Sequence, residues 1–307
     1  MQRDTYKKII EKTREPAFME KTIAYLAEHL GKFLRKGERV LICFPYREKY
    51  SLSWYMEQAV LRCQATPVVW EDKLWKTLLR QAFVEKVTAI IGPPLILLGL
   101  MKLKRYNGTP LFVRRVITAG YPCPEWMREG LKQGFDCEVS DCFALEHSGI
   151  VAGFACGQSW GVHLWEEQYG VDIVDDRGKT VPEGHQGKIV LYPKKFPKLR
   201  LPMEDTAALT REKCSCGSSA PRLINICYGG LRDWELDALA NHLMSWTSIL
   251  DCHVKKGDLG LEIEIITFPG EQLPKLPTAA RLVIRPWDPA EDTPMLHASS
   301  LKALEMM

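Results

Sequence analysis

The strongest constraint on the fold is an alternation, along the first half of the chain, between short apolar runs and segments with helical spacing. The runs are rich in β-branched residues and are continuously apolar, which is typical of strands buried on both faces of a parallel sheet. The stretch between two runs is long enough for one crossover helix, as βαβ units require. We therefore predict an α/β fold with a parallel sheet flanked by helices. The predicted strands are Val40–Phe44, Thr66–Trp70, Ala89–Gly92, Val116–Gly120 and Cys137–Phe143.

Segments with the apolar spacing of amphipathic helices lie between these runs, and one more precedes the first run. We expect them to cover both faces of the sheet, because the crossover connections of βαβ units place helices there. The predicted helices are Met19–Arg35, Ser51–Arg62, Lys73–Val84, Leu95–Arg105 and Pro124–Gln133.

The pattern changes after Gly149. Glycine becomes frequent and turn signals separate shorter apolar runs, which favours antiparallel hairpins that form part of a small barrel. A third section, with a helix over Asp233–Trp246 and three further strands, indicates a small α+β domain. We therefore predict an α/β parallel-sheet subdomain over 1–148, a β-rich barrel-like subdomain over 149–228 and a reduced C-terminal α+β domain over 229–307. The shorter strands are predicted at Gly161–Trp165, Gly170–Val174, Lys188–Tyr192, Asp251–Lys255, Leu259–Phe268 and Ala280–Ile284.

The composition restricts the partners of the chain. Of its 307 residues, 46% are hydrophobic and 26% are charged, which is enough for a sizeable core. The net charge of +3 is too small to indicate nucleic acid or an anionic membrane as a partner. The longest apolar stretch, from Ala89 to Met101, is interrupted by glycine and proline and is too short to span a bilayer. The charged first residues lack the apolar region of a signal peptide, so a cytoplasmic location is expected.

Four residues have the chemistry and the spacing of a metal site. Cys214 and Cys216 form a C-x-C-G element in which Gly217 lets the backbone curl, and Cys156 and His163 lie at the start of the β-rich section. Three thiolates and one imidazole fill the tetrahedral coordination sphere of zinc, which indicates a structural role. The alternatives are ordinary buried thiols with a surface histidine, or an iron–sulfur cluster, which usually needs four thiolates.

A series of motifs in the middle of the chain follows an order known from one family. The motifs are Ala119-Gly120-Tyr121-Pro122, Phe143-Ala144-Leu145-Glu146-His147, Gly161-Val162-His163-Leu164-Trp165-Glu166, Pro182-Glu183-Gly184-His185-Gln186-Gly187, Pro197-Lys198-Leu199-Arg200 and Cys214-Ser215-Cys216-Gly217. In this order they resemble the phenylacetate–coenzyme A ligase branch of the adenylate-forming (AMP-binding) superfamily. Enzymes of that branch make an acyl-adenylate from a carboxylate and ATP and then pass the acyl group to coenzyme A.

The resemblance implies roles for particular residues of this chain. The branch carries a Cys/His plus C-x-C-G metal site, and the four residues proposed above as metal ligands fall at its ligand positions. Gly120, Tyr121 and Phe143 fall where the family binds its nucleotide cofactor. Asp205 falls on the aspartate that holds the ribose hydroxyls in the family.

Residues that handle phosphate in the family are replaced here. The family's Ser/Thr/Gly-rich loop, whose backbone N–H groups cradle the ATP phosphates, corresponds to Lys12–Pro16, which contains no glycine. In the family's aromatic-Gly-x-Thr-Glu motif, Glu146 replaces the threonine and His147 replaces the metal-binding glutamate. These two residues are the candidate catalytic residues.

We therefore interpret the chain as a degenerate, N-terminally shortened ligase-like protein. It would keep a structural zinc site and bind ATP or AMP, a coenzyme A derivative or an acyl group. It could equally serve as a subunit or regulator beside a partner protein or a second copy of itself. The alternative is an active but diverged carboxylate ligase that uses ATP and Mg²⁺, with other residues or a partner chain supplying the missing groups.

Overall fold

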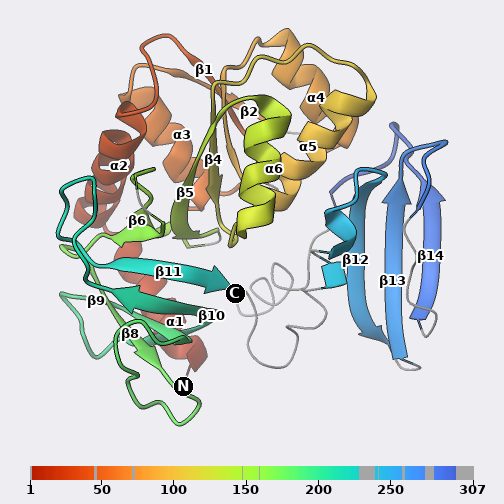
Figure 1. Cartoon of the computed structure of the whole chain (residues 1–307). Coiled ribbons are helices and arrows are strands. Elements are labelled where there is room, and N and C mark those ends of the chain that lie inside the picture. The colour runs from red at the N-terminus through yellow and green to blue at the C-terminus, as the bar shows by residue number, and fades with distance from the viewer. Residues whose placement is uncertain are drawn as a thin grey trace.

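The fold consists of two sheets joined through helices (Figure 1). The larger sheet has eleven strands in the order β2-β1-β3-β4-β5-β6-β7-β11-β10-β9-β8, and the smaller has three in the order β12-β13-β14. In Figure 1 the parallel strands β4 and β5 run upright, whereas β10 and β11 lie across the view beneath them. The computed structural model describes residues 2–44, 47–70, 73–146, 148–158, 160–227, 239–240, 242–257, 260–273 and 280–294.

Five parallel strands form one end of the larger sheet, in the order β2-β1-β3-β4-β5. Most of their residues are apolar because both faces of the strands are covered. All five strands predicted from the sequence are confirmed, with ends that differ by at most two residues. They are β1 (Arg39–Ile42), β2 (Thr66–Val69), β3 (Ala89–Gly92), β4 (Arg115–Ala119) and β5 (Glu138–Leu145).

Helices cover both faces of this parallel part, as predicted. Val40 and Ile42 of β1 pack in one cluster with the helices α2 and α3, while Leu41 and Cys43 pack in another with α4, α5 and α6. Successive residues of a strand point to opposite faces, so one strand serves both clusters. Across the described residues, no helix has the length and apolar character needed to cross a membrane. The helices are α2 (Pro16–Gly31), α3 (Leu52–Arg62), α4 (Trp75–Val84), α5 (Pro94–Tyr106) and α6 (Glu125–Phe135).

The β-rich section extends the same sheet, and the barrel-like subdomain expected from the sequence stays a prediction. After the turn that contains Ser148 and Gly149, β6 pairs antiparallel with β5, so the later strands add to the edge of the parallel part. Gly149 takes φ +62° in this turn, a conformation that glycine adopts without strain. The division at 148/149 stays a prediction. The strands are β6 (Ile150–Phe154), β7 (Val162–Leu164), β8 (Tyr169–Val174), β9 (Gly187–Pro193), β10 (Leu201–Thr210) and β11 (Arg222–Cys227).

The three-stranded sheet packs against α5 from the side opposite to the larger sheet. Its strands are β12 (Ile249–Gly257), β13 (Gly260–Thr267) and β14 (Ala280–Pro286). β12 and β13 form an antiparallel hairpin and β14 runs parallel to β13. Residues 239–240 and 242–244 are helical, whereas the first part of the predicted helix Asp233–Trp246 lies outside the described residues.

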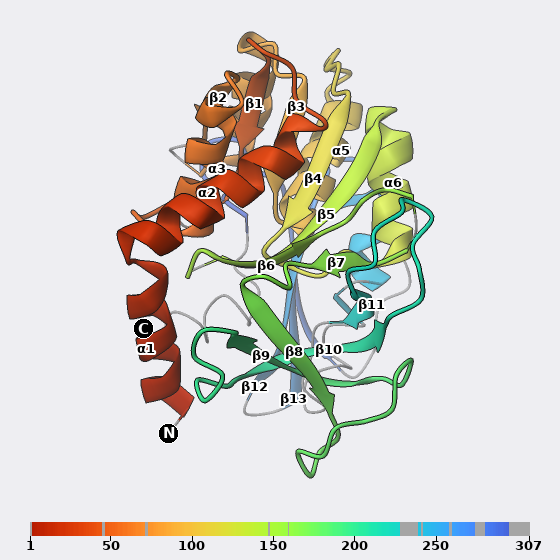
Figure 2. The ribbon, with the colours of Figure 1, turned by 90° about the vertical axis from the view of Figure 1, so that its left-hand side faces the viewer.

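One helix at the start of the chain was not predicted. α1 (Gln2–Thr13) packs Ile9 and Ile10 into the core of the β-rich section. Figure 2 shows α1 running away from α2 and alongside β8 to β10. The beginning of the chain is therefore fixed to strands that follow it by more than a hundred residues.

Candidate metal centre and ligand site

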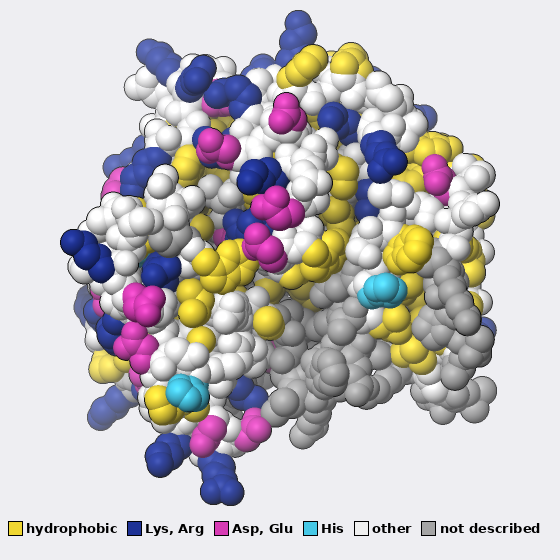
Figure 3. Space-filling view, viewed as in Figure 1, with side chains coloured by type: hydrophobic (Ala, Val, Ile, Leu, Met, Phe, Trp, Pro, Cys, Tyr) yellow, Lys and Arg dark blue, Asp and Glu magenta, His cyan; other side chains and the backbone are white. Residues whose placement is uncertain are grey.

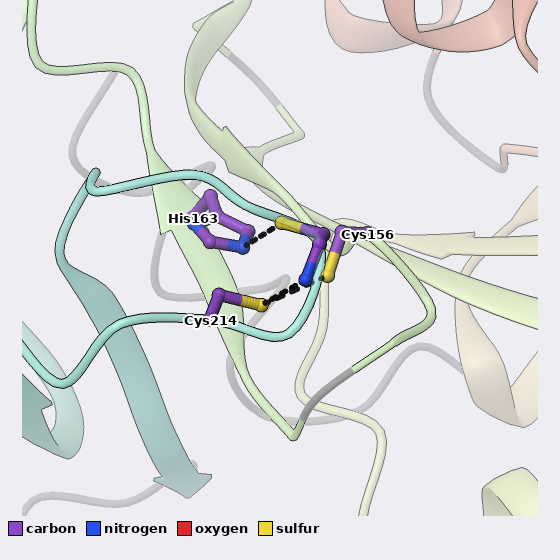
Figure 4. A group of neighbouring side chains, drawn as sticks. Cys156, His163 and Cys214 are labelled. Carbon is purple, nitrogen blue, oxygen red and sulfur yellow. Dashed lines mark hydrogen bonds between the residues drawn. The ribbon is translucent and has the colours of Figure 1, made fainter.

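The four predicted metal ligands converge from two loops that the sheet brings together. Cys156 follows β6 and His163 lies on β7, and β7 pairs with β11 so that His163 stands opposite Arg222. Cys214 and Cys216 lie in the loop between β10 and β11. Figure 4 shows Cys156, His163 and Cys214 pointing toward one another across the gap between these two loops.

The distances within this cluster fit a tetrahedral ion. The sulfurs of Cys156 and Cys214 are 3.6 Å apart, the sulfur of Cys216 is 3.4 Å from Nε2 of His163, and all four ligand atoms lie within 4.8 Å of one another. Zinc at about 2.3 Å from sulfur and about 2.0 Å from nitrogen places two sulfurs about 3.8 Å apart and a sulfur and a nitrogen about 3.5 Å apart. The sulfurs are well beyond the disulfide bond length of about 2.05 Å. The donor set therefore fits zinc.

Backbone groups around the cluster orient its ligands. The N–H groups of Gln158, Cys216 and Ser218 donate to the sulfurs of Cys156, Cys214 and Cys216 at 3.4 to 3.5 Å. Such bonds favour the ionised form of a thiol, which is the form that binds metal. Gly217, at φ +87°, provides the turn after which the N–H of Ser218 reaches the sulfur of Cys216.

The tautomer of His163 suits a metal ligand. Nδ1 of His163 lies 3.2 Å from the carbonyl oxygen of Ala220. A carbonyl oxygen only accepts hydrogen bonds, so Nδ1 carries the proton and Nε2 presents its lone pair to the three sulfurs.

Neighbouring thiols of the cluster also influence the pKa of Cys216. The N–H of Ser218 lowers the pKa of the Cys216 thiol, but burial and the neighbouring thiols of Cys214 and Cys156 raise it, and the net shift is upward. Neighbouring thiolates repel, so a bound cation is what allows all three to ionise together.

A second group of predicted residues meets at the carboxyl end of the parallel strands. Gly120 follows β4 at φ +81°, and a side-chain carbon at this position would lie 3.5 Å from the ring of Phe44 and 3.9 Å from a carboxylate oxygen of Glu146. Phe44 is 1% exposed and Glu146 is 8% exposed. In open α/β sheets, ligands bind at this end of the strands. The structure thus places Gly120 beside Glu146, and their roles in ligand binding and catalysis stay predictions.

The other predicted ligand-site residues pack in different parts of the molecule or on its strands. Phe143 is buried in the core of the β-rich section, and Tyr121 packs at the margin of the cluster around α4 to α6. Asp205 lies on β10 beside Cys227 of β11, where burial raises the pKa of the Cys227 thiol and the charge of Asp205 raises it further. His147 lies outside the described residues.

The segment Lys12–Pro16, which was predicted to correspond to the family's phosphate loop, contacts the turn between β5 and β6. Thr13 is 1% exposed, and its hydroxyl donates to the carbonyl oxygens of Ile10 at 2.8 Å and Ser148 at 3.3 Å. The hydroxyl of Tyr55 donates to the carbonyl of Thr13 at 3.0 Å. The sequence analysis missed this contact. A signal for it was Pro16, which occupies the first turn of α2 and therefore marks the junction between the two helices.

An ion-pair network links the metal loop to the strands β4 and β5, and it too was missed. Arg128 on α6 pairs with Asp141 on β5, which accepts a hydrogen bond from Thr118 on β4. The guanidinium of Arg128 lies 5.1 Å from the ring centre of Trp160, which belongs to the segment between Cys156 and His163. Figure 3 shows acidic and basic side chains intermixed on the face that α6 presents. The metal loop is therefore linked through Arg128 and Asp141 to β4, which ends one residue before Gly120.

By sequence, the chain matches no protein-family profile and no curated protein. Its structure is similar to solved adenylate-forming coenzyme A ligases. 2-Hydroxyisobutyryl-CoA ligase in complex with 2-HIB-AMP aligns with a TM-score of 0.68 and 16% identity, over 94% of this chain and 72% of that chain. Benzoate CoA ligase from Burkholderia xenovorans aligns with a TM-score of 0.57 and 12% identity, over 86% of this chain and 61% of that one.

A third ligase leads to the same assignment of the fold. Anthranilate CoA ligase AuaEII in complex with anthranoyl-AMP aligns with a TM-score of 0.56 and 14% identity, over 93% of this chain and 63% of that chain. The chain thus has the fold of the adenylate-forming coenzyme A ligases. It spans about three fifths to three quarters of the length of these proteins, so their activities are not assigned to it by the fold.

Proposed function

We propose that this chain is a degenerate relative of the adenylate-forming ligases, of the phenylacetate–coenzyme A ligase branch, that binds a small ligand without completing the ATP-dependent reaction. The ligand would be a nucleotide, a coenzyme A derivative or an acyl group held near Gly120 at the carboxyl end of the parallel strands. The resemblance of the motifs and the likeness to ligases solved with acyl-AMP ligands support this proposal.

The observation that carries the proposal is the packing of Thr13 against the turn at Ser148. Binding of ATP phosphates needs a loop whose free N–H groups point at the phosphates, and glycine supplies the backbone freedom for it. In this chain the corresponding segment is the end of one helix and the start of the next. Within this segment, the hydroxyl of Thr13 already donates to the carbonyl of Ser148, and the carbonyl of Thr13 accepts from Tyr55.

The metal centre is proposed as a structural zinc site. Four protein ligands complete the tetrahedron, so no coordination position remains for a substrate or a water. The ion would tie the loop after β6 to the loop between β10 and β11. It would thereby hold β7 and β11 in register at the middle of the larger sheet.

One observation favours the second candidate, an active ligase that uses ATP and Mg²⁺. Glu146 is a buried carboxylate beside Gly120, and buried carboxylates next to a ligand site can hold Mg²⁺. In this alternative Glu146 would take the part of the glutamate that the family uses for the metal ion.

Pyrophosphate exchange into ATP separates the two candidates. We expect no carboxylate-dependent exchange above background, together with a rise in melting temperature on adding AMP, coenzyme A or phenylacetyl-coenzyme A. Robust exchange that disappears in Glu146→Gln would establish the ligase instead. If neither exchange nor a thermal shift is observed with any of these compounds, a role as a protein subunit replaces the ligand-binding proposal.

Two glycine variants test where the ligand binds. Gly120 and Gly108 both have φ near +60° to +80°, so an alanine costs about 1 kcal/mol of backbone strain at either position. A side-chain carbon at Gly108 meets nothing within 4 Å, whereas one at Gly120 contacts Phe44 and Glu146. We expect Gly120→Ala to abolish the ligand-induced thermal shift and Gly108→Ala to retain it. Equal ligand-induced thermal shifts in both variants would show that the ligand binds away from Gly120.

A further inference from the structure

A buried lysine joins the three-stranded sheet to the rest of the molecule. Lys102 lies on α5 and is 4% exposed. Its amine donates to the carbonyl oxygen of Met244 at 2.6 Å and to that of Ile249 at 2.7 Å. Both acceptors are fully buried, one at the end of the helical residues 242–244 and the other at the start of β12. The amine of Lys102 therefore provides hydrogen bonds to two buried carbonyl groups, and these lie where the chain enters the smaller sheet.

The surfaces around this lysine form one continuous apolar cluster. α5 is apolar on nearly all sides because the larger sheet covers one side and the smaller sheet the other. The ring of Tyr106 at the end of α5 stacks on Phe268 after β13, with 4.5 Å between ring centres. At the start of α4, the backbone N–H of Trp75 donates to the carbonyl of Asp292, which follows β14, at 3.1 Å. Lys102 is thus a charge-bearing group in the middle of an apolar interface.

We propose that Lys102 is an internal anchor whose protonation controls docking of the three-stranded sheet on α5. A neutral amine has two N–H donors and meets two carbonyls. An ammonium has three donors and a full charge that the surrounding apolar side chains do not solvate. Uptake of a proton therefore favours a state in which Lys102 reaches water and the smaller sheet has separated from α5 as a unit.

The electrostatic surroundings set the pH range of this behaviour. Burial lowers the pKa of Lys102 from its ordinary value of 10.5 to about 7, and the nearby Cys252 and Asp251 on β12 offset the effect only in part. Between these two pH values the docked state binds fewer protons than the undocked state, so docking becomes stronger as the pH rises. Below pH 7 both states are protonated and the dependence levels off. The ratio of undocked to docked protein then rises about 50-fold on going from pH 9 to pH 7.

The thiol of Cys252 reports undocking directly. Cys252 is fully buried in the interface on β12, while Cys142 is buried on the other face of the larger sheet and reports only global unfolding. The full-length chain is labelled with iodoacetamide, and each thiol is followed by mass spectrometry relative to its rate in the urea-unfolded chain. In the unmodified chain we expect Cys252 to react at least tenfold faster than Cys142, because undocking exposes the first thiol and only global unfolding exposes the second. Lys102→Met should remove the dependence of the Cys252 rate on pH between pH 9 and pH 7, because the variant has no amine to take up the proton.

A matched control uses the same helix. Lys104 donates to the carbonyl of Gly134 on α6 at 3.0 Å, so Lys104→Met removes an amine bond from α5 without touching the smaller sheet. It should retain the pH dependence of the Cys252 rate. A Lys102→Met chain that retains this pH dependence, or a Cys252 that reacts no faster than Cys142 in the unmodified chain, would refute the anchor.

A pH series on the unmodified chain does not depend on the folding of any variant. The normalised rate at Cys252 should rise about 50-fold from pH 9 to pH 7. The rate at Cys142 should remain at least tenfold lower at each pH, because global unfolding frees Lys102 as well and therefore shares the pH dependence. A normalised rate at Cys252 that is independent of pH overturns the protonation control. Neither experiment requires a ligand, so its outcome is separate from that of the proposed function.

Discussion

Replacing Cys214 by serine removes one of the four donors of the metal centre while changing little else. Cys214 is 3% exposed, its sulfur lies 3.6 Å from that of Cys156, and it accepts the N–H of Cys216. A serine hydroxyl is a poor zinc ligand, so the variant should lose the ion. An ion that binds only the folded chain contributes about 4 kcal/mol when free zinc is a thousand times its dissociation constant. At about 2 °C per kcal/mol for a chain of this size, the melting temperature should fall by about 8 °C.

The assay combines zinc content, measured by plasma mass spectrometry, with thermal unfolding followed by circular dichroism. The unmodified protein should hold about one zinc per chain, and Cys214→Ser close to none. The control is Cys227→Ser, because Cys227 is a free thiol on the neighbouring strand β11 and outside the cluster. It should keep the zinc and the melting temperature of the unmodified protein.

A chelator tests whether the lower melting temperature of Cys214→Ser results from the loss of the bound ion. With EDTA in excess, the unmodified protein should fall to the melting temperature of Cys214→Ser, and the variant should not fall further. If the variant remains about 8 °C less stable than the unmodified protein in EDTA, the cysteine stabilises by packing alone and the zinc reasoning is refuted. A folded unmodified protein without bound metal would refute it as well.

Two further predictions concern the packing of helices. Gly99→Ala on α5 should destabilise the protein by about 1–3 kcal/mol in urea unfolding, because its side-chain carbon would lie 2.2 Å from the ring of Trp75. Gly130→Ala on α6 meets nothing within 4 Å and should stabilise by about 0.5–1 kcal/mol; a stabilising Gly99→Ala or a destabilising Gly130→Ala would contradict the packing. Tyr55→Phe removes the donor to the carbonyl of Thr13 and should cost about 0.5–1.5 kcal/mol, with increased hydrogen exchange in α1; unchanged exchange there would show that α1 is held by other contacts.

The sequence revealed the parallel part of the fold because its physical cause is local. A strand covered on both faces must be continuously apolar, as Ala89–Gly92 is, and each crossover helix shows its own period. β10 was missed because it carries Glu204, Asp205 and Thr206 in place of an apolar pattern, and its hydrogen bonds come from β9 on one side and β11 on the other. Its backbone pairing does not depend on its side-chain pattern, so no local signal marks it.

The metal ligands were predictable for a related reason. The spacing of the cysteines and the histidine indicated a site, the order of the surrounding motifs supported it, and the structure brings all four residues together. Lys102 carries no such signal. In the sequence it is simply a lysine within an apolar helix. Its hydrogen-bond partners, the carbonyls of Met244 and Ile249, lie 142 and 147 residues further along the chain. The contact of Thr13 with Ser148, across 135 residues, was unpredictable for the same reason.

The position of α5 between two sheets has a consequence for biosynthesis. The helix leaves the ribosome well before the strands that cover its second side, because β12 and β13 begin at Ile249 and Gly260. Until these strands emerge, the apolar side that will receive them faces solvent on a nascent chain. Exposed apolar surface of this kind is what chaperones bind and what drives aggregation. The time during which the chain needs such protection is set by the translation of the residues between α5 and β13.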